Sequence, residues 1–154
     1  MKTLSQKAKY GLRALYALGR KYGEGPVMVG LLAEEEAIPK KFLELILLEL
    51  KNLGIVASKK GKHGGYQLSR PPSEITLGRV IRILDGPLAP LPCASETAYQ
   101  KCEECADEES CGTRLVMRRV RDAIALILDG TTIDDVCRQV DAVKRKSKGR
   151  AKRA

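Results

Sequence analysis

The chain has 154 residues, 44% of them hydrophobic, which suits one compact domain with an accessory element. Aromatic residues make up only 4%, and the abundance of Leu, Ile, Val and Ala favours helices packed on helices. No apolar run approaches the roughly 20 residues that a membrane helix needs, and no signal-peptide pattern follows the basic N-terminus. We therefore expect a cytoplasmic protein without a membrane partner.

The net charge of +9 is distributed unevenly. Residues 1–70 carry 13 basic and 6 acidic side chains, residues 71–141 carry 8 and 13, and residues 142–154 carry 7 and none. A basic front is typical of phosphate binding, although a solubilising surface explains the charge equally well. The terminal basic run predicts a disordered tail over 144–154 that adds non-specific DNA affinity.

Helical periodicity predicts three helices in the first part of the chain. The first contains apolar residues at helical spacing from Leu4 to Leu18 and begins after Ser5, a suitable N-cap. A short second helix spans 29–36. A third spans 39–53, begins at Pro39 and ends before Gly54. Two helices joined by the turn at 36–39 form a helix-turn-helix candidate.

A hairpin pattern follows the third helix directly. Residues 54–58 resemble a strand, residues 59–65 form a basic, glycine-rich turn, and residues 66–68 alternate again as a returning strand. Three helices followed by a cationic hairpin predict a winged helix, a mainly α fold with a small two-stranded β wing.

A recognition helix enters the major groove with its N-terminal residues first. Lysines bind phosphate or a guanine edge, a glutamate accepts from cytosine, and a phenylalanine contacts a thymine methyl. Phe42 is as plausible in the core. The DNA-contacting candidates on this helix are Pro39, Lys40, Lys41, Phe42 and Glu44.

Further DNA contacts are predicted from the wing and from the first helix. Basic side chains and flexible glycines at a wing tip suit the minor groove or its flanking phosphates. The wing candidates are Lys59, Lys60, Lys62, His63 and Gly64, and those of the first helix are Lys2, Ser5, Lys9 and Tyr10.

Four of the five cysteines, Cys93, Cys102, Cys105 and Cys111, fall within 19 residues of an acidic loop. Thiolates are soft ligands that suit an iron–sulfur cluster or zinc. A redox pair at Cys102 and Cys105 is a further alternative, but neighbouring acids should raise the thiol pKa values and oppose a reactive nucleophile. With no catalytic constellation elsewhere, we do not expect an enzyme. Cys137 fits a small core residue of the last helix.

A long amphipathic helix is predicted from Thr113, its candidate N-cap, to about residue 128. Residues 131–135 offer two overlapping capping boxes for a final helix. The apolar side of the long helix indicates a two-fold dimer interface, unless it packs on its own domain. That side comprises Val116, Val120, Ala123, Ile124 and Ile127.

These parts together resemble the Rrf-type winged-helix transcriptional regulators, the family of IscR, NsrR and CymR. The resemblance covers about residues 1–136 and rests on LSQKAKYGLRALYALG, IPKKFLELILLELKNLGIV, KKGKHGGYQLSRPPSEITLGRVI and the cysteine loop. It implies a homodimer that binds a palindromic operator on double-stranded DNA, typically as a repressor. It also implies a 2Fe–2S or 4Fe–4S cluster whose state alters DNA binding in response to iron, redox state or nitric oxide.

The cysteine pattern departs from that of the family. IscR has a histidine three residues beyond the last cysteine, whereas this chain has Arg114 there. Cys102 and Cys105 both lie near the middle position of the family pattern. A four-cysteine site and a three-cysteine site with an outside ligand therefore remain alternatives, as do zinc and a thiol redox switch. The expected organisation is a DNA-binding domain (1–86), a cluster loop (87–112), a dimerisation and a final helix (113–143), and a tail (144–154).

Overall fold

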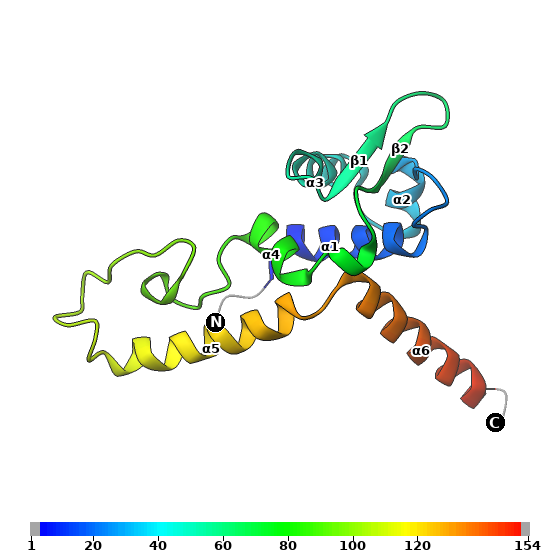
Figure 1. Ribbon diagram of the computed structural model, residues 1–154. Coiled ribbons are helices and arrows are strands. Elements are labelled where there is room, and N and C mark those ends of the chain that lie inside the picture. The colour runs from blue at the N-terminus through cyan, green and yellow to red at the C-terminus, as the bar shows by residue number, and fades with distance from the viewer. Residues whose placement is uncertain (1–3, 152–154) are drawn as a thin grey trace.

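The computed structural model describes the backbone of residues 4–151 and the side chains of residues 4–146 (Figure 1). It is mainly helical, with one two-stranded antiparallel sheet, which confirms the predicted fold class. The helices are α1 (Gln6–Arg20), α2 (Val29–Glu35), α3 (Lys40–Asn52), α4 (Leu77–Asp85), α5 (Gly112–Asp129) and α6 (Ile133–Ala151). The strands are β1 (Val56–Lys59) and β2 (Gly65–Leu68), and short 3₁₀ turns span Pro72–Glu74 (η1) and Pro92–Ala94 (η2).

Helix α1 lies at the centre of the fold and packs against α3, α4, α6 and the wing, with α3 and the wing above it and α6 below it in Figure 1. Its small residues permit close packing: a Cβ on Gly11 would overlap the side chain of Leu84 on α4. The apolar stripe predicted for α3 is buried at Leu43, Ile46, Leu47 and Leu50. This core positions the outer face of α3 and the wing.

Two helix starts use the predicted caps. The Ser5 hydroxyl accepts from the Ala8 N–H at 3.0 Å, and it also donates to Asp85 at the end of α4. At α6, Thr132 and Asp135 form a reciprocal capping box, with backbone-to-side-chain bonds of 2.9 and 3.1 Å. Local sequence therefore determines where α1 and α6 begin.

The wing is anchored to the helical body by a third piece of chain. Val56 pairs with Leu68 and Lys59 with Gly65 across the hairpin. Val27, just before α2, exchanges two 2.8 Å backbone hydrogen bonds with Tyr66. Gly65 has a φ of +153°, and a Cβ there would overlap the carbonyl of Val27. Glycine is thus required where the wing meets the body.

Two predictions about the C-terminal part are wrong. Thr113 does not cap α5, because the helix begins at Gly112 and the Cys111 carbonyl accepts its first bond, from Leu115 at 3.0 Å. The predicted disorder is wrong over residues 144–151, where α6 continues to Ala151, while the rest of the predicted tail, residues 152–154, lies outside the described residues. Lysine, arginine and alanine are good helix formers, so the charge run does not interrupt a helix already started.

The cysteine loop and α5 extend away from the body, while α6 projects in another direction (Figure 1). Leu115, Val116, Leu126 and Ile127 on α5 are each about half exposed or more. Within the described residues, no helix combines the length and apolar character needed to cross a membrane.

Candidate DNA interface and cysteine site

The outer face of α3 presents the predicted recognition residues. Lys40, Lys41 and Glu44 are exposed, while Pro39 occupies the N-cap position just before the helix. Leu45 and Leu48 continue the same face and are 65% and 48% exposed. Because the stripe on the opposite face is buried, this surface is free to enter a groove of DNA.

The structure brings the start of α3 and the wing together around one groove. The groove has a volume of about 400 Å³ and runs between the start of α2, the start of α3 and the root of the wing. Lys40 from α3 and Lys59 and Gly64 from the wing line it together. These predicted residues, far apart in sequence, therefore form one cationic surface.

The other wing candidates extend beyond this groove. Lys60, Lys62 and His63 are exposed at the tip of the hairpin, which lies far from the cysteine loop (Figure 1). His63 is thus positioned as a wing residue rather than as a partner of the cysteines. A basic tip of this kind is suited to the sugar–phosphate backbone.

The aromatic candidates Tyr10 and Phe42 contact each other at the junction of α1 and α3. Their rings meet edge to face at 5.7 Å, and both are half-buried against the core. The guanidinium of Arg13 lies 5.7 Å from the centre of the Tyr10 ring. This packing supports the core alternative for Phe42, and its contact with a base stays a prediction.

The candidates on α1 are placed differently from one another. Lys9 is exposed, whereas Lys2 lies outside the described residues. The single proton of the Ser5 hydroxyl is donated to Asp85, so none remains for a phosphate while that bond holds. The Ser5 backbone N–H also donates to Asp85, at 2.8 Å. Ser5 therefore links α1 to α4.

Three of the clustered cysteines are neighbours at the start of α5. The thiols of Cys102 and Cys111 both interact with the Cys105 thiol, and Cys111 is the N-cap residue of α5. Cys93 lies apart on η2 and is buried, and Cys137 is buried in the core, where its thiol contacts the Tyr16 carbonyl at 3.5 Å. Within residues 4–151, no three His, Cys, Asp or Glu side chains form a ready-made metal site.

The thiols differ in acidity, and the acidic neighbours are not the main cause. The hydrogen bonds with Cys111 and Cys102 raise the pKa of Cys105 to about 12. The pKa of Cys111 is lowered, chiefly by the backbone N–H of Arg114 and then by the Cys105 thiol. The expectation that acids raise the thiol pKa values is therefore wrong for Cys111, because it lies at a helix N-terminus.

Glu108 organises the loop that carries the cysteines. Its carboxylate accepts a hydrogen bond from the Tyr99 hydroxyl and one from the Cys102 backbone N–H at 3.0 Å. These bonds, the one from Tyr99 first, lower the pKa of Glu108. The acidic loop is therefore held together by specific bonds to one of its acids.

Sequence reasoning missed several side chains that shape these two surfaces. The exposure of Leu45 and Leu48 could have been found from helical spacing, because these residues lie four and seven positions beyond Lys41 on the same face of α3. Arg114 and Arg121 hold the cysteine loop on α5 through backbone carbonyls, and no sequence pattern indicates such partners.

The chain resembles known transcriptional regulators over most of its length. The Rrf2 family, described as iron-dependent transcriptional regulators, matches residues 4–139. An rrf2-like HTH-type transcriptional regulator of Rhodobacter capsulatus is 39% identical over 136 residues, covering 86% of this chain and 91% of that protein. The HTH-type regulator CymR of Bacillus subtilis is 34% identical and covers 90% and 91%.

Solved structures agree with the sequence matches. CymR, the global cysteine regulator of B. subtilis, superposes with a TM-score of 0.76 over 90% of this chain and 98% of that one. IscR of T. potens superposes with a TM-score of 0.72 at 29% identity, covering 90% of this chain and 88% of that chain. These relatives are transcriptional regulators and not enzymes, in agreement with the sequence-based expectation. The chain belongs to the Rrf2 family of winged-helix transcriptional regulators.

Proposed function

We propose that this regulator binds a palindromic operator as a homodimer, acts as a repressor, and responds to an iron–sulfur cluster held by Cys93, Cys102, Cys105 and Cys111. The observation that carries this proposal is the interaction of the Cys105 thiol with those of Cys102 and Cys111, the last of which is the N-cap residue of α5. That helix packs on α4, and α4 packs on α1 of the DNA-binding domain. A conformational change in the cysteine loop would therefore reach the DNA-binding domain through the α5–α4 and α4–α1 contacts.

The DNA-binding half of the proposal is supported by shape and charge. Exposed lysines of α3 and of the wing line one groove, and backbone hydrogen bonds anchor the wing to the body. In this arrangement α3 enters the major groove, and the lysines of the wing neutralise phosphates beside it.

The dimer is supported by the exposed side of α5. Val116 and Ile127 on the predicted apolar face are 51% and 66% exposed. A second copy related by a two-fold axis would cover this face and set the spacing between two α3 helices. A palindromic operator would then match the symmetry of the protein.

The cluster half is supported by the donor set. Four thiols, which are soft ligands, on a segment of 19 residues suit an iron–sulfur cluster or zinc, and the lowered pKa of Cys111 favours the thiolate that ligation requires. A bound cluster supplies a redox-active iron centre. This chain contributes the thiolates, a loop ordered by Glu108, and an α5 that begins directly after a ligand.

Anaerobic purification with iron and acid-labile sulfide analysis tests the cofactor. We expect a brown protein with a visible absorption band and stoichiometric iron and sulfide. A colourless protein with stoichiometric zinc, or with disulfides and no metal, would contradict the cluster and support the alternative of a zinc site or a thiol switch. The interaction of the Cys105 thiol with two other free thiols is the feature that favours a switch.

A further inference from the structure

Helix α5 is largely exposed, yet it buries one charged side chain. Arg121 is only 8% exposed, whereas Leu126 on the same helix is 79% exposed. A buried guanidinium loses its hydration and must find partners that replace water. The partners of Arg121 therefore indicate its role.

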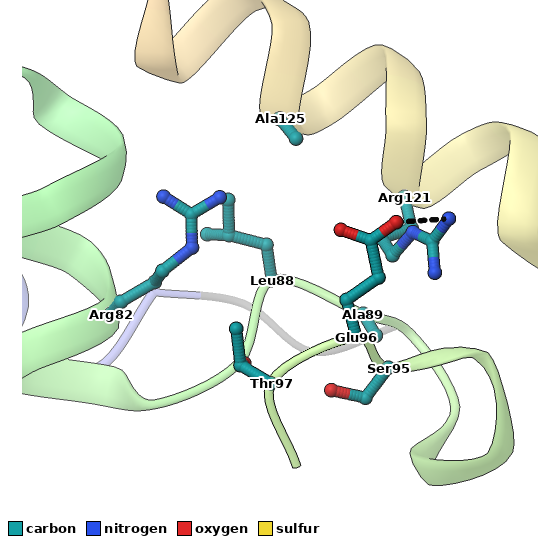
Figure 2. A pocket seen from close by; sticks show the side chains of 8 residues that line it. All are labelled: Arg82, Leu88, Ala89, Ser95, Glu96, Thr97, Arg121 and Ala125. Atoms are coloured by element: carbon teal, nitrogen blue, oxygen red, sulfur yellow. Dashed lines mark ion pairs between the residues drawn. The ribbon is translucent and has the colours of Figure 1, made fainter. Parts of the chain in front are cut away.

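Those partners belong mostly to the segment that follows Cys93. Nη1 of Arg121 donates to the Ala94 carbonyl at 2.6 Å, and Nη2 lies 3.1 Å from the Glu96 carboxylate. Asp122, the next residue on α5, accepts from Nε at 2.8 Å. Figure 2 shows Arg121 reaching from α5 to Glu96, with Ser95 and Ala89 of the loop beneath it.

A second arginine holds the adjacent residue. Arg114 lies seven residues earlier on α5, two turns away on the same face. Its Nε donates to the Cys93 carbonyl at 3.0 Å, and its Nη1 approaches the Glu108 carbonyl at 3.4 Å. Two consecutive carbonyls, those of Cys93 and Ala94, are thus fixed to one helix.

This attachment determines where Cys93 lies. Eight residues of loop separate Cys93 from Cys102, so the loop by itself leaves the distance between them undetermined. Cys111, in contrast, is joined directly to α5. With its backbone held on α5, Cys93 is 8% exposed, and its position relative to Cys111 is set by the helix.

We propose that Arg121 is a positioning residue of the cysteine site, which holds the Cys93 segment on α5 and so sets where the Cys93 thiol lies relative to the other three. The role given to the four cysteines rests on the proposed function. The attachment itself does not, and it is tested separately.

Cysteine labelling of the metal-free full-length protein tests the attachment. Iodoacetamide is added to reduced protein, and peptide mass spectrometry follows each cysteine. In Arg121→Gln we expect Cys93 to react about tenfold faster than in the wild type, while Cys137, buried by the core, keeps its rate. Arg118→Gln, an exposed arginine three residues earlier, is the matched control and should leave both rates unchanged.

Two results would overturn the proposal. One is an unchanged Cys93 rate in Arg121→Gln. The other is an equal acceleration of Cys137, which would mean general loosening of the fold. If Arg121→Gln does not fold, Arg114→Gln replaces it, because it removes the bond to the Cys93 carbonyl and should likewise accelerate Cys93 while Cys137 keeps its rate.

A second measurement links the attachment to the cofactor. After anaerobic reconstitution, the visible band of Arg121→Gln should differ in position or intensity from that of wild type and Arg118→Gln. Identical spectra in all three proteins would refute the positioning role. A wild-type protein that takes up no iron and sulfide would refute the proposed function, while the labelling result would still decide the attachment.

Discussion

Arg82 on α4 and Asp129 at the end of α5 form a two-bond ion pair, with nitrogen–oxygen distances of 2.6 and 2.9 Å. Gly78 lies directly beneath it, because a Cβ there would overlap the Asp129 carboxylate. The pair joins residues 47 positions apart and connects the helix that follows the cysteine loop with the DNA-binding domain. Figure 2 shows Arg82 extending from α4 beside Leu88 of that loop.

The ion pair predicts a pH-dependent contribution to stability. The hydrogen bond from Arg82 lowers the pKa of Asp129 in the folded protein, so the stabilisation is present above the unfolded pKa and is lost as pH falls through the folded value. Asp129→Asn should therefore lower the free energy of unfolding at pH 7 by less than about 1 kcal/mol, because the pair is partly exposed. Urea unfolding should show this difference shrinking as the pH falls below about 4, the ordinary pKa of an aspartate, and disappearing below the lowered pKa of Asp129 in the folded protein. A difference that persists in acid would contradict the assignment. Glu24→Gln, on an exposed turn, is the control and should leave the stability unchanged at both pH values.

The recognition surface predicts a reduced salt dependence of operator binding. Neutralising Lys40, Lys41 or Lys62 singly to Gln should lower the slope of log K against log salt by about one for each. Lys101→Gln, on the distant cysteine loop, should leave the slope unchanged. Fluorescence anisotropy titrations at several salt concentrations measure it. An unaltered slope in all three variants would exclude this face.

The cysteine site predicts a clear separation among single variants. Cys93→Ala, Cys102→Ala and Cys111→Ala should bleach the anaerobic protein, whereas Cys137→Ala should keep its colour, because that thiol lies in the core beside Tyr16. Visible absorption with iron analysis is the measurement. Full colour in all three of the first set would refute the ligand choice.

The close approach of Gly65 to Val27 at the base of the wing predicts that a side chain at residue 65 disrupts the wing. In Gly65→Ala, the new methyl would collide with the Val27 carbonyl and break the bridge to Tyr66, so operator affinity and thermal stability should both fall. Gly30→Ala is the matched control for stability, because a Cβ there meets nothing within 4 Å and α2 should gain up to about 1 kcal/mol. Equal melting temperatures for both variants would contradict this account.

The turn between α2 and α3 predicts a stabilising substitution. Ala37 has a φ of +48°, a left-handed conformation that costs an alanine about 1 kcal/mol relative to glycine. Ala37→Gly should therefore raise the melting temperature slightly, since the strain outweighs the added freedom of the unfolded chain. Ala33→Gly, buried inside α2, should lower the free energy of unfolding by more than about 1 kcal/mol and the melting temperature with it. Calorimetry compares the two, and a fall for Ala37→Gly would show that no strain is relieved.

The features that the sequence determined by itself are local ones. The Ser5 cap, the Thr132–Asp135 capping box, the buried stripe of α3 and the glycine-rich wing follow from interactions within a few residues, so their patterns could be read directly. The start of α5 differs from the predicted one because Thr113 is a common N-cap residue and cysteine is not, and only the folded loop places Cys111 at the N-cap.

The tertiary structure alone decided how these parts are connected. Arg121 reaches Ala94 across 27 positions and Ser5 reaches Asp85 across 80, and neither pair leaves a periodic signal. Such contacts depend on how the chain closes in space, and backbone carbonyls, which every residue carries, accept many of them. For the same reason, sequence reasoning identified the four clustered cysteines but not the arginines that hold Cys93 in place.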